Sequence, residues 1–437
     1  MRYPALGLFL TAACAFAQLG EYAGPSVLSR GAGGGVAPVS PIAFRPYVNV
    51  NALYTSGLLE RELRPDGTLR DDGLYGGEAA LGLYGYRAWK RTVVGLNYRG
   101  DYRRYNRATT QDRSNHFLSL GITHRVSRQL EITLRQGAGS FSHNYGSFGS
   151  FGFFDPTFAN IPYDELLDNR TNYLTSMADL SYIATPRLSF NFGGSGFTVR
   201  RQQSSLYGVT GANARSDIAC RVTRRTTIAV DYLFAHFGFD KAFGGSDMHS
   251  AAANYSYQIN RWWQIGLRGG AMRLETSYLG TVAIDPLVAA IIGRTTGYRA
   301  FYRRQIEPTF SLQLSRAFRG ASAQVSYHYG ATPGNGVYLT SRQNAVSANY
   351  SYTGMRHWHF NASGYYRDLE GVGQDLRSYQ TGGGGLNATR MLGSRNLYVT
   401  GRLDYRRTIA GANFRRDYRS ASVGFAYSPG DVPLRLW

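Results

Sequence analysis

The sequence is poor in cysteine and, after its first residues, in long apolar runs. Only Cys14 and Cys220 occur among 437 residues. Cys14 lies near the end of a predicted export signal, so removal of that signal leaves Cys220 alone and excludes an intrachain disulfide. No later stretch reaches the roughly 18 consecutive apolar residues of a membrane-spanning helix. Long stretches with a 3.6-residue apolar period are also missing, which argues against a soluble α/β enzyme.

Acidic residues are scarce relative to basic ones. The chain has 28 Asp and Glu against 48 Lys and Arg, a formal charge of +20. Such an excess is typical of proteins that bind nucleic acid. Here the basic residues are dispersed along the chain and follow an export signal, so we predict no nucleic-acid partner.

Motifs of known catalytic sites are absent as well. The chain has no Gly-x-Ser-x-Gly, no His-Glu-x-x-His, no phosphate-binding Walker loop and no paired-cysteine motif. His357 and His359 share one face of a predicted strand, but a zinc site needs at least one further ligand. No helix follows the four glycines at 382–385, so they predict a kink or a close-packing site rather than a phosphate cradle. We predict no enzyme, no metal site and no cofactor.

The first residues predict export. Residues 1–17 combine Arg2, an apolar stretch and the small-x-small sequence that ends at Ala17, which is typical of a signal peptide. A lipoprotein cleavage before Cys14 is the alternative, but the leucine-like residue expected three positions earlier is missing. Residues 18–44, rich in Gly and Pro, predict a flexible periplasmic leader.

A repeat of arginines dominates the rest of the chain. Subtracting neighbouring positions gives spacings of 37, 59, 37, 37, 58, 37 and 39 residues. The two long intervals each contain one oversized segment. A unit repeated at this length, with its insertions on one side, predicts an array of β-hairpins with tight turns at one end. The repeated arginines are Arg91, Arg128, Arg187, Arg224, Arg261, Arg319, Arg356 and Arg395.

Apolar and polar residues alternate on both sides of these arginines. In residues 130–135, Leu130, Ile132 and Leu134 share one face of a strand and the intervening residues share the other. Uniformly short turns at one end favour a membrane barrel over a soluble sandwich. We predict a single all-β, antiparallel, up-and-down transmembrane barrel over residues 45–430. We count about 18 strands, with 16 as the alternative, place both termini in the periplasm, and assign residues 431–437 to a C-terminal tail.

The turn sequences carry a resemblance. Residues 223–232 read Thr-Arg-Arg-Thr-Thr-Ile-Ala-Val-Asp-Tyr, and residues 260–267 and 185–190 are related versions. The chain thereby resembles a family of β-barrel porins found with exopolysaccharide export operons. The resemblance covers most of the barrel. It implies residence in the outer membrane of a Gram-negative-type bacterium, contact with outer-membrane lipid and lipopolysaccharide, insertion by the barrel assembly machinery, and a role in transport.

The end of the chain departs from the usual barrel pattern. Such barrels commonly end on an aromatic residue that closes the last strand. Here the alternation through Phe425 and Tyr427 stops at Pro429, and Pro433 breaks the segment that leads to Trp437. Either the Phe425–Tyr427 pair or Trp437 is the signal for the assembly machinery.

The polar face of the strands supplies the candidate functional residues. Arginines and acids alternate there, and arginines facing acids across a pore create a transverse field in which a net basic surplus favours anions. The alternative is that the pairs only fill a wide lumen. The first interpretation adds small anions or an anionic polysaccharide as partners. The predicted lumen-lining residues are Arg99, Asp101, Arg103, Glu131, Arg135, Arg221, Asp231, Arg268, Arg402, Asp404 and Arg406.

Two further features bear on function. The turn arginines predict anchors at the membrane interface rather than transport residues. The oversized segments 143–171 and 278–306 are expected to cap the barrel or to fold into it as a constriction. In the second segment, a short helix is expected after Asp285 with Pro286 at its first position. The leading function is therefore a channel, and the rival is a non-conducting structural or surface-interaction barrel.

Overall fold

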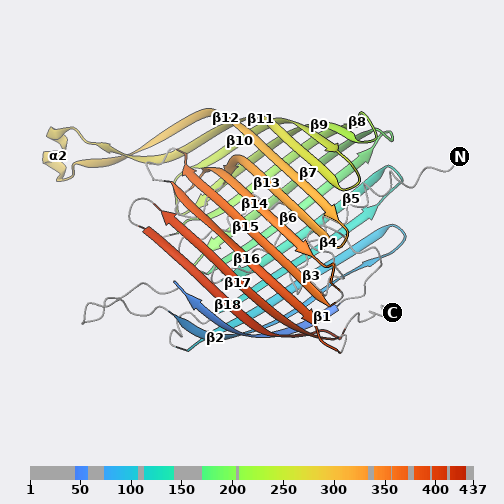
Figure 1. Cartoon of the computed structure of the whole chain (residues 1–437). Coiled ribbons are helices and arrows are strands. Elements are labelled where there is room, and N and C mark those ends of the chain that lie inside the picture. The colour runs from blue at the N-terminus through green and yellow to red at the C-terminus, as the bar shows by residue number, and fades with distance from the viewer. Residues whose placement is uncertain are drawn as a thin grey trace.

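A computed structural model describes residues 45–57, 73–106, 113–141, 170–202, 206–332, 339–355, 357–372, 378–393, 396–410 and 414–429. Within these ranges the chain forms one antiparallel sheet of 18 strands (Figure 1). Each strand pairs with its sequence neighbours, and β1 also pairs with β18, which closes the sheet into a barrel. The predicted fold class and the higher of the two strand counts are confirmed. Closure leaves no unpaired sheet edge around the wall.

The strands have the following bounds in chain order. They are β1 Arg45–Ser56, β2 Leu74–Ala88, β3 Thr92–Tyr105, β4 Arg113–Arg125, β5 Leu130–Phe141, β6 Thr171–Ile183, β7 Leu188–Arg201, β8 Gly208–Arg221, β9 Thr226–Asp240, β10 Gly245–Gln258, β11 Trp263–Ala283, β12 Thr296–Phe318, β13 Ala321–Thr332, β14 Ser341–Tyr352, β15 Trp358–Gly371, β16 Tyr379–Met391, β17 Leu397–Ala410 and β18 Phe414–Tyr427. The single described helix, α2, spans Pro286–Ile292. No helix in these ranges is long and apolar enough to cross a membrane.

Four of the short turns that carry the repeated arginines share one hydrogen-bonding device. At the β8–β9 turn, the Thr223 hydroxyl accepts hydrogen bonds from the backbone N–H groups of Arg225 and Thr226 at 3.1 and 3.0 Å. Ser127, Thr185 and Asn260 accept the equivalent pairs in their own turns. A Ser, Thr or Asn side chain of this kind replaces the backbone partners that a tight turn lacks. The small polar residue therefore makes the turn, and the neighbouring arginine is exposed at its tip.

The wall has an apolar outer face and a largely polar inner face. Along β1, Val48 and Val50 are 52% and 59% exposed, whereas Asn51 and Thr55, which follow them, are 7% and 1% exposed. The same alternation continues around the barrel, because successive side chains of a strand point to opposite faces. Exposed apolar and buried polar side chains are the reverse of a soluble protein and are typical of a barrel that faces lipid.

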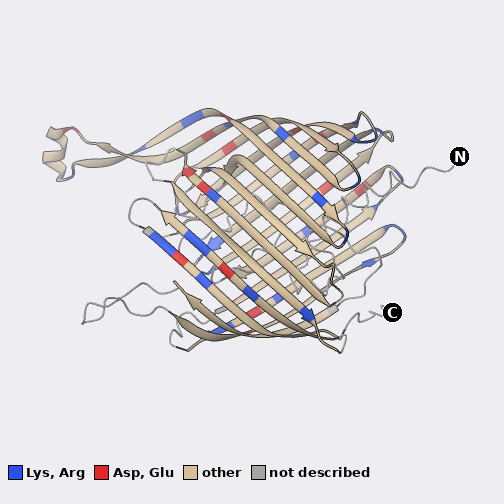
Figure 2. Ribbon diagram, viewed as in Figure 1, with Lys and Arg blue, Asp and Glu red and all other residues tan. Residues whose placement is uncertain are grey.

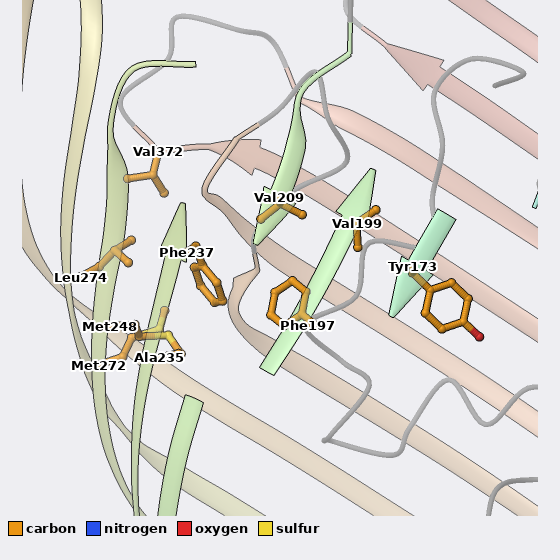
Figure 3. Packing of buried hydrophobic residues seen from close by; sticks show 10 residues of the cluster. All are labelled: Tyr173, Phe197, Val199, Val209, Ala235, Phe237, Met248, Met272, Leu274 and Val372. Carbon is orange, nitrogen blue, oxygen red and sulfur yellow. The ribbon is translucent and has the colours of Figure 1, made fainter. Parts of the chain in front are cut away.

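The inner face has one apolar exception. Side chains of β6 to β11 that point inward near the longer connections form a buried cluster, which Val372 completes from the β15–β16 side (Figure 3). Aromatic and aliphatic residues meet there on the inner face of the strands, which the sequence pattern predicted to be polar. The cluster consists of Tyr173, Phe197, Val199, Val209, Ala235, Phe237, Met248, Met272, Leu274 and Val372.

The β11–β12 hairpin corrects one expectation. The predicted helix is present: Pro286 is in its first turn, and the Asp285 side chain accepts a hydrogen bond from the Leu287 N–H at 2.8 Å. The segment neither caps nor constricts the barrel, because it projects beyond the other strands (Figure 1). β10 pairs with β11 only as far as Ser277, whereas β11 and β12 stay paired to Ala283 and Thr296. Without a lateral neighbour, the two-stranded ribbon follows its own twist away from the wall.

Several sequence-based predictions fall outside the described residues. The other oversized segment, 143–171, is described only from residue 170 onward, so its predicted capping role stays a prediction. The same holds for the signal peptide, the leader and Trp437. β1 begins and β18 ends at the barrel end that carries the short turns. Placing that end in the periplasm remains an expectation.

Candidate functional site

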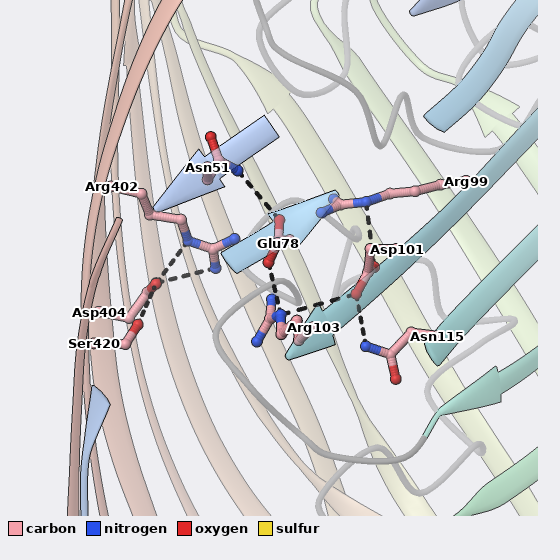
Figure 4. Close-up of polar contacts among 9 residues, drawn as sticks. All are labelled: Asn51, Glu78, Arg99, Asp101, Arg103, Asn115, Arg402, Asp404 and Ser420. Carbon is pink, nitrogen blue, oxygen red and sulfur yellow. Dashed lines mark hydrogen bonds and ion pairs between the residues drawn. The ribbon is translucent and has the colours of Figure 1, made fainter. Parts of the chain in front are cut away.

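The candidate site is a network of charged side chains on the inner wall of β1 to β4 and β17 (Figure 4). Glu78 on β2 lies at its centre. Strand register places Asn51 of β1 and Arg103 of β3 directly beside it, on the same inner phase. Arg103 Nε lies 2.6 Å from Glu78 Oε2, and Asn51 Nδ2 donates to Oε1 at 3.3 Å. Both Glu78 oxygens therefore have partners, which a buried carboxylate needs.

Asp101 extends the network along β3. Its carboxylate lies 3.7 Å from Arg99 Nε and 3.9 Å from Arg103 Nε. Asn115 of β4, in register with Asp101, donates to the same carboxylate at 2.8 Å. The two-residue period of a strand places Arg99, Asp101 and Arg103 in one inward row, so opposite charges alternate along the wall.

A second part of the network lies on β17. Arg402 Nε is 2.7 Å from Asp404 Oδ2, and Ser420 of β18 donates to Asp404 at 3.4 Å. Gly385 of β16 lies opposite Asp404, and a Cβ at Gly385 would come within 2.7 Å of the carboxylate. A Cβ at Gly383 would approach the Tyr405 carbonyl oxygen to 2.6 Å. These approaches confirm the predicted close packing at Gly383 and Gly385.

Two ion pairs lie farther around the inner wall. Arg268 of β11 forms a two-pronged pair with Asp231 of β9 at 3.0 and 2.7 Å, and Asn254 of β10 also donates to Asp231, at 2.5 Å. Arg215 of β8 reaches Asp179 of β6 in a second pair, at 2.6 Å. A planar guanidinium can donate two hydrogen bonds to one carboxylate, and such pairs therefore fix the orientation of both side chains. The pairs therefore join β9 to β11 and β6 to β8, each across the strand between them.

The remaining predicted residues have separate surroundings. Glu131 lies 3.7 Å from Arg125 in a partly exposed pair. Arg135 is buried on β5, and Arg221 is half-buried at the short-turn end of β8. The guanidinium of Arg406 lies over the Tyr418 ring, 5.8 Å from its centre. The structure thus brings seven of the eleven predicted residues into the network of Figure 4 or into the Arg268–Asp231 pair, and it leaves four at other positions: Glu131, Arg135, Arg221 and Arg406.

Sequence reasoning missed several charged members of the inner wall. Glu78 lies among glycines and alanines that show no clear alternation, and Asp179, Arg215 and Asp217 went unnoticed although they share the inward phase of their strands. The two-residue period of a strand, applied from a neighbouring apolar residue, would have assigned these charged residues to the inner face. Glu78 matters most, because with it the network of Figure 4 contains as many carboxylates as arginines. Arg99, Arg103 and Arg402 face Glu78, Asp101 and Asp404 there.

Arginine nevertheless predominates over the wall as a whole. Among inward positions of the described wall, the arginines are Arg99, Arg103, Arg125, Arg135, Arg201, Arg215, Arg221, Arg268, Arg367, Arg402, Arg406 and Arg416. The carboxylates there are Glu78, Asp101, Glu131, Asp179, Asp217, Asp231, Glu307 and Asp404. The twelve arginines exceed the eight carboxylates, and because the network of Figure 4 is balanced, this surplus lies outside it.

The two histidines do not share one environment. His359 is 1% exposed, with Nε2 3.4 Å from the Ser351 hydroxyl oxygen, whereas His357 precedes β15 and is exposed. Within the part of the chain that the structure describes, no three His, Cys, Asp or Glu side chains are grouped as metal ligands.

Comparison with known proteins gives only distant likenesses. No family model and no curated protein matches the chain. Among solved structures, the chain is similar to OccK2 (OpdF) of Pseudomonas aeruginosa, with 13% identity, 90% of this chain and 100% of that chain covered, and a TM-score of 0.42. It is also similar to a BenF-like porin from Pseudomonas fluorescens Pf-5, with 11% identity, 88% and 98% covered, and a TM-score of 0.42. Likenesses this distant do not show what this barrel does.

Proposed function

We propose that the chain is an outer-membrane channel whose inner wall favours anionic solutes. The observation that supports it is the combination of an apolar outer face with a buried row of alternating guanidinium and carboxylate groups inside a closed barrel. Closed barrels are the one sheet structure that satisfies every backbone group in lipid, and 18 strands enclose a wide lumen. Apolar side chains are enough to fill space inside a barrel, as they do in the cluster around Phe237. A row of charged groups is not needed for that purpose.

The expected selectivity follows from the charge distribution. Arginine stays charged at every physiological pH, so the surplus of inward guanidinium groups raises the local concentration of anions. The network of Figure 4 adds a transverse field but no net charge. Solutes that carry phosphate or uronate groups suit such a wall, and a charged polysaccharide segment is the largest of them. Export of such a polymer is the specific role that the resemblance suggests.

Reversal potentials in planar bilayers under a salt gradient test this proposal. The triple variant Arg99→Ala/Arg135→Ala/Arg402→Ala should lose anion preference. The matched control is Arg128→Ala/Arg187→Ala/Arg224→Ala, which removes the same charge from exposed turn tips and should keep it. Equal selectivity in both variants would contradict the proposal, and so would a folded wild-type barrel that does not conduct.

The β11–β12 hairpin favours a second candidate function, a surface-interaction barrel. Its tip exposes apolar side chains, with Leu287 and Ile291 79% and 84% exposed. Apolar side chains so far from the wall are costly unless a partner covers them. Deletion of residues 284–295 separates the two functions. Channel function predicts unchanged conductance and an unchanged cell-envelope phenotype, whereas surface interaction predicts an altered phenotype at unchanged conductance.

A further inference from the structure

A group of arginines faces outward where β17 leads into β18. We name Arg407, Arg415 and Arg419, with Asp417, the rim arginine cluster. Their outward direction follows from the strand period, because Thr408 and Tyr418, the next residues along, are buried on the inner side at 6% and 3% exposed. Figure 2 shows positive and negative positions side by side at this end of both strands. The strands join there through one of the longer connections, opposite the short turns.

One carboxylate holds the cluster together. Arg407 Nε lies 2.6 Å from Asp417 Oδ1, and Arg415 Nε lies 3.8 Å from Oδ2. The Tyr405 hydroxyl donates to Asp417 at 3.0 Å. The Arg407 and Arg415 side chains are still 44% and 61% exposed, and Asp417 is 30% exposed. The cluster thus carries a net positive charge and presents several N–H donors in one direction.

The third arginine adds to that charge. Arg419 pairs in register with Tyr405 on β17, and it lies two residues from Asp417 on the same outer face, on the side opposite Arg415. Among the described residues it has no carboxylate partner. Three guanidinium groups around one carboxylate match a doubly charged phosphate, because arginine binds phosphate through parallel N–H donors.

Apolar residues on the same strands show which kind of phosphate fits. Toward the short-turn end, the outward residues Leu403, Val423 and Phe425 are 56%, 59% and 59% exposed. Charge at the rim followed by an exposed apolar wall matches a phosphorylated headgroup with acyl chains below it. A free phosphate ion would gain nothing from that wall. The arginines of the turn repeat lie at the other end and are separated from one another by whole hairpins.

We propose that the rim arginine cluster binds the phosphate of a phosphorylated glycolipid in the outer leaflet, with acyl chains against Leu403, Val423 and Phe425. The inference rests on the proposed outer-membrane location. Asp417 would orient Arg407 and Arg415 before the lipid arrives. A bound lipid at this position would also cover the wall beside the β1–β18 closure.

Native mass spectrometry of the detergent-purified barrel tests the site. The probes are bisphosphorylated lipid A, the same lipid after phosphatase treatment, and inorganic phosphate. The variant is Arg407→Gln/Arg415→Gln/Arg419→Gln, and the control is Arg128→Gln/Arg187→Gln/Arg224→Gln. We expect the cluster variant to bind bisphosphorylated lipid roughly tenfold or more weakly than the control does. Wild type should bind the dephosphorylated lipid and inorganic phosphate weakly.

Three results would overturn the assignment. They are equal affinity in the two variants, equal binding of the dephosphorylated lipid, and binding of inorganic phosphate as tight as that of the lipid. Heat-modifiable gel mobility checks that each variant folds, and the single variant Arg419→Gln replaces the triple one if it does not. Conductance measured on the same samples keeps the two proposals apart, because loss of lipid binding leaves the channel wall unchanged.

Discussion

Arg103 and Glu78 pair across neighbouring strands on the inner wall, with 2.6 Å between Nε and Oε2 and side chains only 10% and 9% exposed. Strand register alone makes them neighbours, because both lie on the inward phase of β2 and β3. Removal of one partner from a buried pair leaves the other charge uncompensated. This pair therefore connects the stability of the barrel wall with its electrostatic field.

Glu78→Ala should destabilise the barrel by about 3 kcal/mol, because Arg103 loses its closest carboxylate in a buried position. Glu131→Ala is the matched control. Its pair with Arg125 is longer and 21% to 40% exposed, so the loss should stay below about 1 kcal/mol. Urea unfolding in lipid vesicles measures both. Equal losses would mean that burial does not strengthen the Glu78 pair.

Two single variants of the same network should shift ion selectivity in opposite directions. Glu78→Gln removes a negative charge and should raise the preference for anions. Arg402→Gln removes a positive charge and should lower it. Both changes keep a polar side chain that can form hydrogen bonds. Reversal potentials measure the sign, and a shift of both variants in the same direction would show that the network does not face the conducting path.

Thr223→Ala should weaken the β8–β9 turn by about 1 kcal/mol, because two backbone N–H groups lose their acceptor. Arg224→Ala, one residue later at an exposed position, should change stability by less than about 0.5 kcal/mol. Equilibrium unfolding of the two variants compares them directly. A larger effect from Arg224 would show that the repeated arginine, rather than the small polar residue, determines the turn.

Labelling of intact cells tests the orientation of the barrel. Cys220 is exposed on the outer face, so a Cys220→Ser background is needed. In it, Val288→Cys at the tip of the β11–β12 hairpin should react with a membrane-impermeant maleimide, and Arg224→Cys at a short turn should not. The opposite pattern would place the longer connections in the periplasm.

Much of this fold follows from the sequence because its signals are local. The weakly alternating ranges 208–222 and 379–391 were assigned as strands from periodicity, and the structure has β8 at Gly208–Arg221 and β16 at Tyr379–Met391. The helix after Asp285 was likewise predictable, because its capping side chain and its proline lie within the segment itself.

The candidate site was only partly predictable. Arg99, Asp101 and Arg103 form an alternating row that the sequence displays directly. Glu78 went unnoticed because its neighbours on β2 are glycines and alanines, which mark no face. Its importance comes from the register that places it between Asn51 and Arg103.

The sequence by itself determined the strand period and the turns, since each depends on residues a few positions apart. The tertiary structure decided three things. It determined which charges become partners, that inward side chains of β6 to β11 form an apolar cluster around Phe237, and that the β11–β12 hairpin points away from the barrel. Each of these depends on register and on where pairing with a neighbouring strand ends. Those contacts join residues far apart in the chain, and no local pattern encodes them.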